Sequence, residues 1–137
     1  MTMNFVSSQY LLGLHDAELT AIAIDRANSI ARLDFKLENG AFHTVELKGL
    51  RAFRSEDLTM QNVVSRVLQS SKNEFSTDDL AHWITWVTSL SDATSWLSGL
   101  RKQEWINDCV NGSLELVVFE PSVGAQIVAT CDALVLS

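Results

Sequence analysis

The sequence predicts an α+β domain: an antiparallel β-sheet of five or six strands, with two helices packed on one side. Three observations indicate this class. Apolar and polar residues alternate within residues 17–48, and two further strand-like segments close the chain. Two segments with helical spacing lie between these regions. Because strand-rich ends can join in one sheet, the helical part is left to cover it. With 137 residues, 47% of them apolar, the chain fits a single domain, 1–137.

The first predicted hairpin has a strict alternation in its second strand. Within residues 30–38, IARLDFKLE, apolar and charged side chains alternate at every position from Ala31 onward. The preceding ELTAIAID can pair with them through a tight turn at Asn28 and Ser29. This turn sets Ile24 opposite Leu33, so that apolar side chains face each other across the two strands.

The second predicted hairpin has two competing registers. A two-residue turn at its Asn-Gly pair is the commoner connection, but it would turn the apolar residues of the third strand toward the charged face. A three-residue loop of residues 38–40, with Gly40 in the left-handed region, instead sets His43 opposite Phe35. We expect the second register, because a slip of one residue would expose a whole apolar set.

The middle of the chain contains one ambiguous segment and two predicted helices. Residues 60–69, MQNVVSRVLQ, fit either helix or strand, and their β-branched content favours strand. A helix is predicted over 77–90, where Ser76 and Asp79 have the spacing of a capping box. A shorter helix is predicted over 101–110.

Two strands are predicted at the C-terminal end, over 113–121 and 125–137, joined at the turn PSVG. The last strand is apolar at both odd and even positions. This pattern is typical of an interior strand that is covered on both faces.

The net charge of −7 lies in the second half of the chain. Residues 1–72 carry eight acidic and eight basic side chains, whereas residues 73–137 carry nine acidic and two basic ones. Such a half repels phosphate backbones, so we expect no nucleic-acid partner. It would favour a basic protein partner by electrostatic steering.

The composition also predicts a cytoplasmic location. The N-terminal residues lack the basic region of a signal peptide, and no segment approaches the roughly 20 apolar residues that span a bilayer. We therefore expect no membrane partner. In a reducing compartment Cys109 and Cys131 would be thiols, not a disulfide.

The motif LHDAEL places His15 beside Asp16 and close to Glu18, which could line the pocket of a small-molecule-binding protein or a hydrolase. The same residues suit a turn before a strand, and we favour this interpretation. His43 is expected to be a packing histidine, about 23 Å along the strand direction from His15, which excludes a shared zinc site unless the chain bends sharply. The sequence contains no HExxH, CxxC or G-x-S-x-G motif, so no catalytic residue, metal or cofactor is predicted.

Four tryptophans fall between positions 83 and 105. Trp86 is displaced from the apolar stripe of its predicted helix, and an exposed tryptophan beside acidic residues is typical of a protein-binding hot spot. The candidate partner-binding residues are Trp86, Trp96, Asp78 and Asp79. A homodimer through this surface or through an exposed sheet edge is compatible with such a site.

Three segments carry a resemblance to a known group of proteins: LHDAEL at the start of the meander, FRSEDL to QNVV, and PSVGAQIVATC. Together they resemble small uncharacterised bacterial proteins, some of which are grouped with immunity proteins of polymorphic toxin systems. The resemblance covers the first 70 and the last 25 residues and leaves the tryptophan-rich middle uncovered. It implies a stoichiometric inhibitor of a toxin. The leading hypothesis is therefore a non-enzymatic, cytoplasmic protein-binding module, and the alternative is the pocket near His15 and Asp16.

Overall fold

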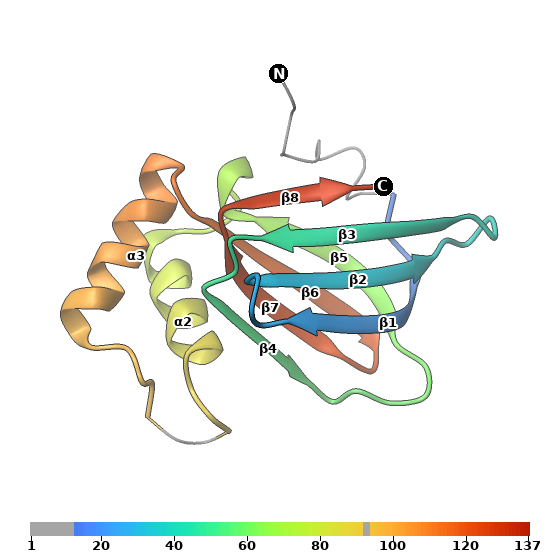
Figure 1. Ribbon diagram of the computed structural model, residues 1–137, viewed down its shortest axis with the longest axis horizontal. Coiled ribbons are helices and arrows are strands. Elements are labelled where there is room, and N and C mark those ends of the chain that lie inside the picture. The colour runs from blue at the N-terminus through green and yellow to red at the C-terminus, as the bar shows by residue number, and fades with distance from the viewer. Residues whose placement is uncertain (1–12, 92–93) are drawn as a thin grey trace.

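The computed structural model describes residues 13–91 and 94–137, and these form an α+β structure with one antiparallel sheet and two α-helices (Figure 1). The predicted class is confirmed, including the two helices on one side of the sheet. The predicted number of strands is wrong, because the sheet has eight, in the order β4-β7-β6-β5-β1-β2-β3-β8. The elements are β1 (Glu18–Asp25), β2 (Ile30–Lys36), β3 (Phe42–Lys48), β4 (Ala52–Glu56), β5 (Val63–Gln69), the 3₁₀ turn η1 (Ser70–Lys72), α2 (Thr77–Val87), α3 (Gly99–Asn111), β6 (Glu115–Val123), β7 (Gln126–Cys131) and β8 (Ala133–Leu136).

The extra strands arise because two segments bend at a shared corner of the sheet. The predicted last strand divides at Asp132 into β7 and β8, and β3 continues past Gly49 into β4, which the sequence did not predict as a strand. Pairing continues through the corner, since the Asp132 N–H donates to the Lys48 carbonyl at 2.8 Å. Gly49 has φ +66, and an added Cβ would lie 2.2 Å from Asp132 Oδ2, so the close approach requires glycine. The bend curls the sheet.

The first hairpin has a different register from the predicted one. Ile24 lies opposite Ala31, not Leu33, and residues 26–29 form a longer connection than the predicted two-residue turn. The cause is the Asp25 carboxylate, which accepts hydrogen bonds from the backbone and side-chain N–H groups of Asn28. From Ala21 to Asp25 the shift is two residues, so these side chains keep their predicted face.

The second hairpin has the predicted register. His43 lies opposite Phe35, and Gly40 has φ +89 in the three-residue loop. His43 is half-buried, and its Nδ1 has no hydrogen-bond partner among the described residues, so packing holds the ring. The ambiguous segment 60–69 contains strand β5, as its β-branched residues favoured.

Two separate apolar clusters form on the two faces of the curled sheet. On the inner face, the meander β1–β3 packs against β6 and β7, and the rings of Phe35 and Phe119 stack with centroids 5.9 Å apart. On the outer face, α2 and α3 cover β4, β6 and β7. Alternate residues of β6 serve the two clusters, since Val117 belongs to the inner one and Val118 to the outer one. Strands β6 and β7 are therefore covered on both faces, by the meander on the inner face and by the two helices on the outer face.

Side-chain caps set the helix boundaries. The Ser76 hydroxyl accepts the Asp79 N–H, and the Asp79 carboxylate accepts the Ser76 N–H, both at 3.1 Å, which confirms the capping box of α2. Helix α3 begins at Gly99, before the predicted residue 101, because the Ser98 hydroxyl accepts the Arg101 N–H. Neither helix has the length and hydropathy that a membrane span requires.

Candidate functional site

His15 and Asp16 lie in the turn that precedes β1. Asp16 has φ +64, and its N–H donates to the Val64 carbonyl at 2.9 Å. His15 Nδ1 lies 2.6 Å from the Ser65 carbonyl oxygen, and Nε2 lies 3.4 Å from the Asp16 carboxylate. A carbonyl can only accept, so Nδ1 carries the proton and Nε2 faces a carboxylate. Both acceptors favour the protonated imidazole, and they raise the pKa of His15.

We expect His15 to titrate above its ordinary value of 6.5. Because the folded pKa is the higher one, the stabilisation by this group is complete below pH 6.5 and is lost as the pH rises through the folded pKa. NMR titration of the imidazole checks this, and Asp16→Asn should move the pKa of His15 down. A pKa at or below 6.5 in the folded protein would contradict the assigned contacts.

Glu18 lies on β1 and lines a depression of about 460 Å³. We call it the Met60 depression, after the fully exposed Met60 on its rim. It lies between β1 and the connection from β4 to β5, and His15 and Asp16 are not among its lining residues. The structure therefore places Glu18 in a concave region apart from the His15–Asp16 pair.

Both cysteines are buried free thiols. Burial, with a smaller contribution from Glu115, raises the pKa of Cys109 to about 12. The same two causes raise the pKa of Cys131. A thiol attacks as its thiolate, so both side chains are poor nucleophiles in the folded protein.

We expect neither cysteine to react with the thiol reagent DTNB within minutes at pH 8 in the folded protein, and both to react promptly in urea. The reason is the suppressed thiolate together with burial. Absorbance of the released thionitrobenzoate measures the labelling. Fast stoichiometric labelling of the native protein would show that one thiol is accessible and ionised.

The four predicted partner-binding residues lie in two depressions and at the start of α2. Trp86 and Asp78 line a depression of about 510 Å³, the Trp86 depression, and the Arg54 guanidinium lies 4.1 Å from the centroid of the Trp86 ring. The Asp79 carboxylate caps α2. Trp96 lines another depression, of about 600 Å³, which we call the Trp96 depression. Arg54, Ser89 and Ser91 line both depressions.

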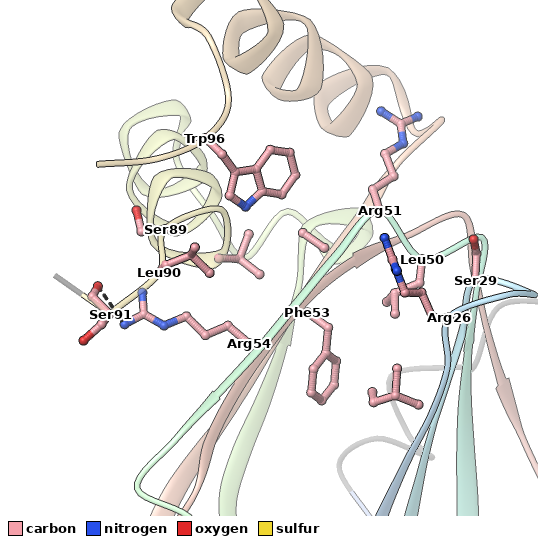
Figure 2. A pocket seen from close by; sticks show the side chains of 13 residues that line it. Arg26, Ser29, Leu50, Arg51, Phe53, Arg54, Ser89, Leu90, Ser91 and Trp96 are labelled. Carbon is pink, nitrogen blue, oxygen red and sulfur yellow. Dashed lines mark hydrogen bonds between the residues drawn. The ribbon is translucent and has the colours of Figure 1, made fainter. Parts of the chain in front are cut away.

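The Trp96 depression lies between the corner of the sheet and the segment that follows α2 (Figure 2). Figure 2 shows Trp96 and Leu90 on one side and Arg26 and Leu50 on the other. Three of its apolar side chains are exposed: Trp96 at 56%, Leu90 at 72% and Ile24 at 53%. The lining residues are Ile24, Arg26, Ser29, Leu50, Arg51, Ala52, Phe53, Arg54, Val87, Ser89, Leu90, Ser91 and Trp96.

The described lining of this depression contains three arginines and no carboxylate. Arg51 pairs with Asp108 at 3.1 Å, outside the depression. Arg54 pairs with Glu56 and donates to the Trp86 carbonyl at 2.8 Å, so it fastens β4 to the end of α2. Arg26 has no ion-pair partner among the described residues. Arg26 therefore supplies the unpaired positive charge of this concave region, in a chain of net charge −7.

Sequence reasoning identified Trp96 but missed the arginines around it. Arg26 lies in a turn, Arg51 lies just before the unpredicted strand β4, and Arg54 lies within it. The equal numbers of acidic and basic residues in the first half of the chain gave no sign that these arginines gather. The stretch LRAFR, with two arginines flanking an aromatic residue, was the available signal.

Comparisons with known proteins assign the chain to no family: no family model matches it, and no curated protein or solved structure matches it significantly. Within residues 13–91 and 94–137, no three histidine, cysteine, aspartate or glutamate side chains are grouped so that they could hold a metal ion.

Proposed function

We propose that this chain is a non-enzymatic protein-binding module and that it binds its partner through the Trp96 depression. The observation that carries the proposal is the gathering of exposed Trp96, Leu90 and Ile24 around one concave region. Tryptophan and arginine are enriched at the energetic centres of protein interfaces. Clustered exposed apolar side chains mark interaction sites, whereas single scattered ones do not.

The proposed class of partner is a toxin, which the protein inhibits stoichiometrically in the cytoplasm. The sequence resemblance to immunity-grouped bacterial proteins supports this class. The chemistry of the thiols is compatible with it, since their raised pKa values leave them poor nucleophiles and binding alone needs none.

Affinity capture from a lysate of the organism that encodes the chain tests the proposal. We expect the wild-type chain to retain a partner and Trp96→Ala to lose it, because Trp96 is an exposed aromatic side chain of the depression and tryptophan is enriched among binding hot spots. The matched control is Phe42→Ala, which removes another exposed aromatic ring, at the start of β3 and outside this lining. Equal capture by wild type and Trp96→Ala, or no partner at low and high salt, would refute the proposal.

A second candidate function is the binding of a small anionic molecule. Its support is the size of the Trp96 depression, about 600 Å³, which falls within the range of small-molecule sites, together with unpaired Arg26. A ligand that binds only the folded state raises the melting temperature. Thermal shift with a panel of carboxylates and phosphates tests it: Arg26→Gln should abolish a shift caused at this depression, whereas His15→Ala should abolish one caused at the His15–Asp16 turn.

A further inference from the structure

Strand β1 has an open edge next to the proposed binding site. On one side, β2 pairs with β1 along the whole strand. On the other side, β5 pairs with β1 only where Glu18 lies opposite Val63. The last hydrogen bond on this side joins the Leu19 N–H to the Asn62 carbonyl at 2.8 Å. Beyond it, residues 20–25 have no strand partner on this edge among the described residues. Figure 1 shows β1 at the border of the meander.

The chain just before β5 forms a turn that the Asn62 side chain holds in place. Asn62 is 6% exposed, and its Oδ1 accepts the N–H groups of Thr59 and Ala125, both at 3.0 Å. Its Nδ2 donates to the Thr59 carbonyl at 2.7 Å. These bonds hold the chain before β5 against the connection between β6 and β7, and the Met60 depression separates this chain from residues 20–22 of β1. A register irregularity in the β1–β2 pairing, between Leu19 and Ala21, lies next to the last hydrogen bond between β1 and Asn62.

Two depressions follow one another along this edge. The Met60 depression is lined by β1 residues up to Ile22, and the Trp96 depression is lined by Ile24 and Arg26. Ile22 and Ile24 lie opposite Leu33 and Ala31, so both point to the inner face of the curled sheet. Unpaired backbone and concave apolar surface therefore lie side by side.

We infer that an extended, acidic segment of the partner protein binds here as an added strand on residues 20–25 of β1. The inference rests on the proposed function and names the chemistry of the partner. Strand addition gives affinity through backbone hydrogen bonds and specificity through pockets for alternate side chains. The open edge is about 20 Å long, which fits a segment of about six residues.

The pattern of the segment follows from the surfaces beside the edge. Alternate side chains of an added strand would face Ile22, Ile24 and Phe53, so every second residue should be apolar. Arg26, at the end of β1, should contact an acidic side chain of the segment. The net charge predicted a basic partner, but charges are screened beyond about 8 Å in physiological salt. Arg26, which has no ion-pair partner among the described residues, therefore sets the charge that the bound segment should carry.

Selection from a displayed library of random 12-residue peptides against the immobilised full chain tests the inference. We expect enrichment of acidic peptides with apolar residues at alternate positions. Arg26→Gln should raise the dissociation constant of the best synthetic peptide at least tenfold, as measured by fluorescence polarisation. Arg66→Gln is the matched control, since Arg66 is exposed on β5 and lines neither depression, and it should change the affinity less than twofold.

N-methylation of the peptide backbone separates strand addition from side-chain docking. An added strand pairs along one edge, so methylating alternate nitrogens should abolish binding in one frame and preserve it in the other. Equal binding in both frames would overturn strand addition and leave the proposed protein-binding function standing. Enrichment of basic peptides, or of no peptide family, would also overturn the inference, whereas the capture assay with Trp96→Ala decides the proposed function independently.

Discussion

Glu115→Ala is expected to lower the free energy of unfolding by about 3–4 kcal/mol. The side chain is 1% exposed and has no basic partner in the described part of the chain, but it accepts hydrogen bonds from η1 and its neighbours. Oε1 accepts the Ser70 hydroxyl and the Ser71 N–H at 2.8 Å each, and Oε2 accepts the Gln69 amide at 2.9 Å. Removing the carboxylate takes the acceptor from the buried Gln69 amide and from the part-buried Ser70 and Ser71 donors, at about 1–3 kcal/mol for each donor left unsatisfied. Urea denaturation followed by tryptophan fluorescence measures the change.

Glu120→Ala is the matched control for this prediction. It removes a glutamate from the same strand, but that side chain is 28% exposed and pairs with the exposed Arg66. We expect the free energy of unfolding to fall by less than about 1 kcal/mol. A Glu115→Ala protein as stable as Glu120→Ala would show that the hydrogen bonds to Glu115 do not hold η1 on β6.

Phe119→Ala is expected to lower the free energy of unfolding by about 3–5 kcal/mol, because it opens a cavity in the inner cluster. Phe119 is 1% exposed and stacks on Phe35 across the inside of the curled sheet. Phe42→Ala, which removes a ring that is 69% exposed, should change stability by less than about 0.5 kcal/mol. Chemical denaturation of both variants provides the comparison.

A double-mutant cycle separates the ring contact from simple burial. If Phe35 and Phe119 stack as described, the double variant should show a coupling of about 0.5–1.5 kcal/mol. Strictly additive losses would mean that the meander and β6 do not meet on the inner face.

Local patterns in the sequence predicted the elements that depend on neighbouring residues. The register of the second hairpin followed from the cost of exposing its apolar face, and the start of α2 followed from Ser76 and Asp79. The first hairpin was misjudged by two residues because the Asp25–Asn28 hydrogen bonds select a longer turn with the same face pattern. Alternation alone does not distinguish the two registers.

The corner of the sheet and the candidate site could not be predicted from local patterns. The division of the last strand depends on Gly49 meeting Asp132, residues that lie far apart in the sequence. The Trp96 depression likewise combines Arg26, Arg54 and Trp96 from three separate regions. Their proximity is set by the fold, and only Trp96 had a signal of its own.

The most direct test of the proposed site is to measure partner affinity and stability in the same variant, Trp96→Ala. Because Trp96 is more than half exposed and contacts Trp105 only edge-on, at 6.1 Å between centroids, we expect a stability loss of about 1 kcal/mol or less. The dissociation constant for the captured partner, measured by calorimetry, should rise about 30-fold or more, as at a binding hot spot. An unchanged dissociation constant in a stably folded Trp96→Ala protein would contradict binding through this depression.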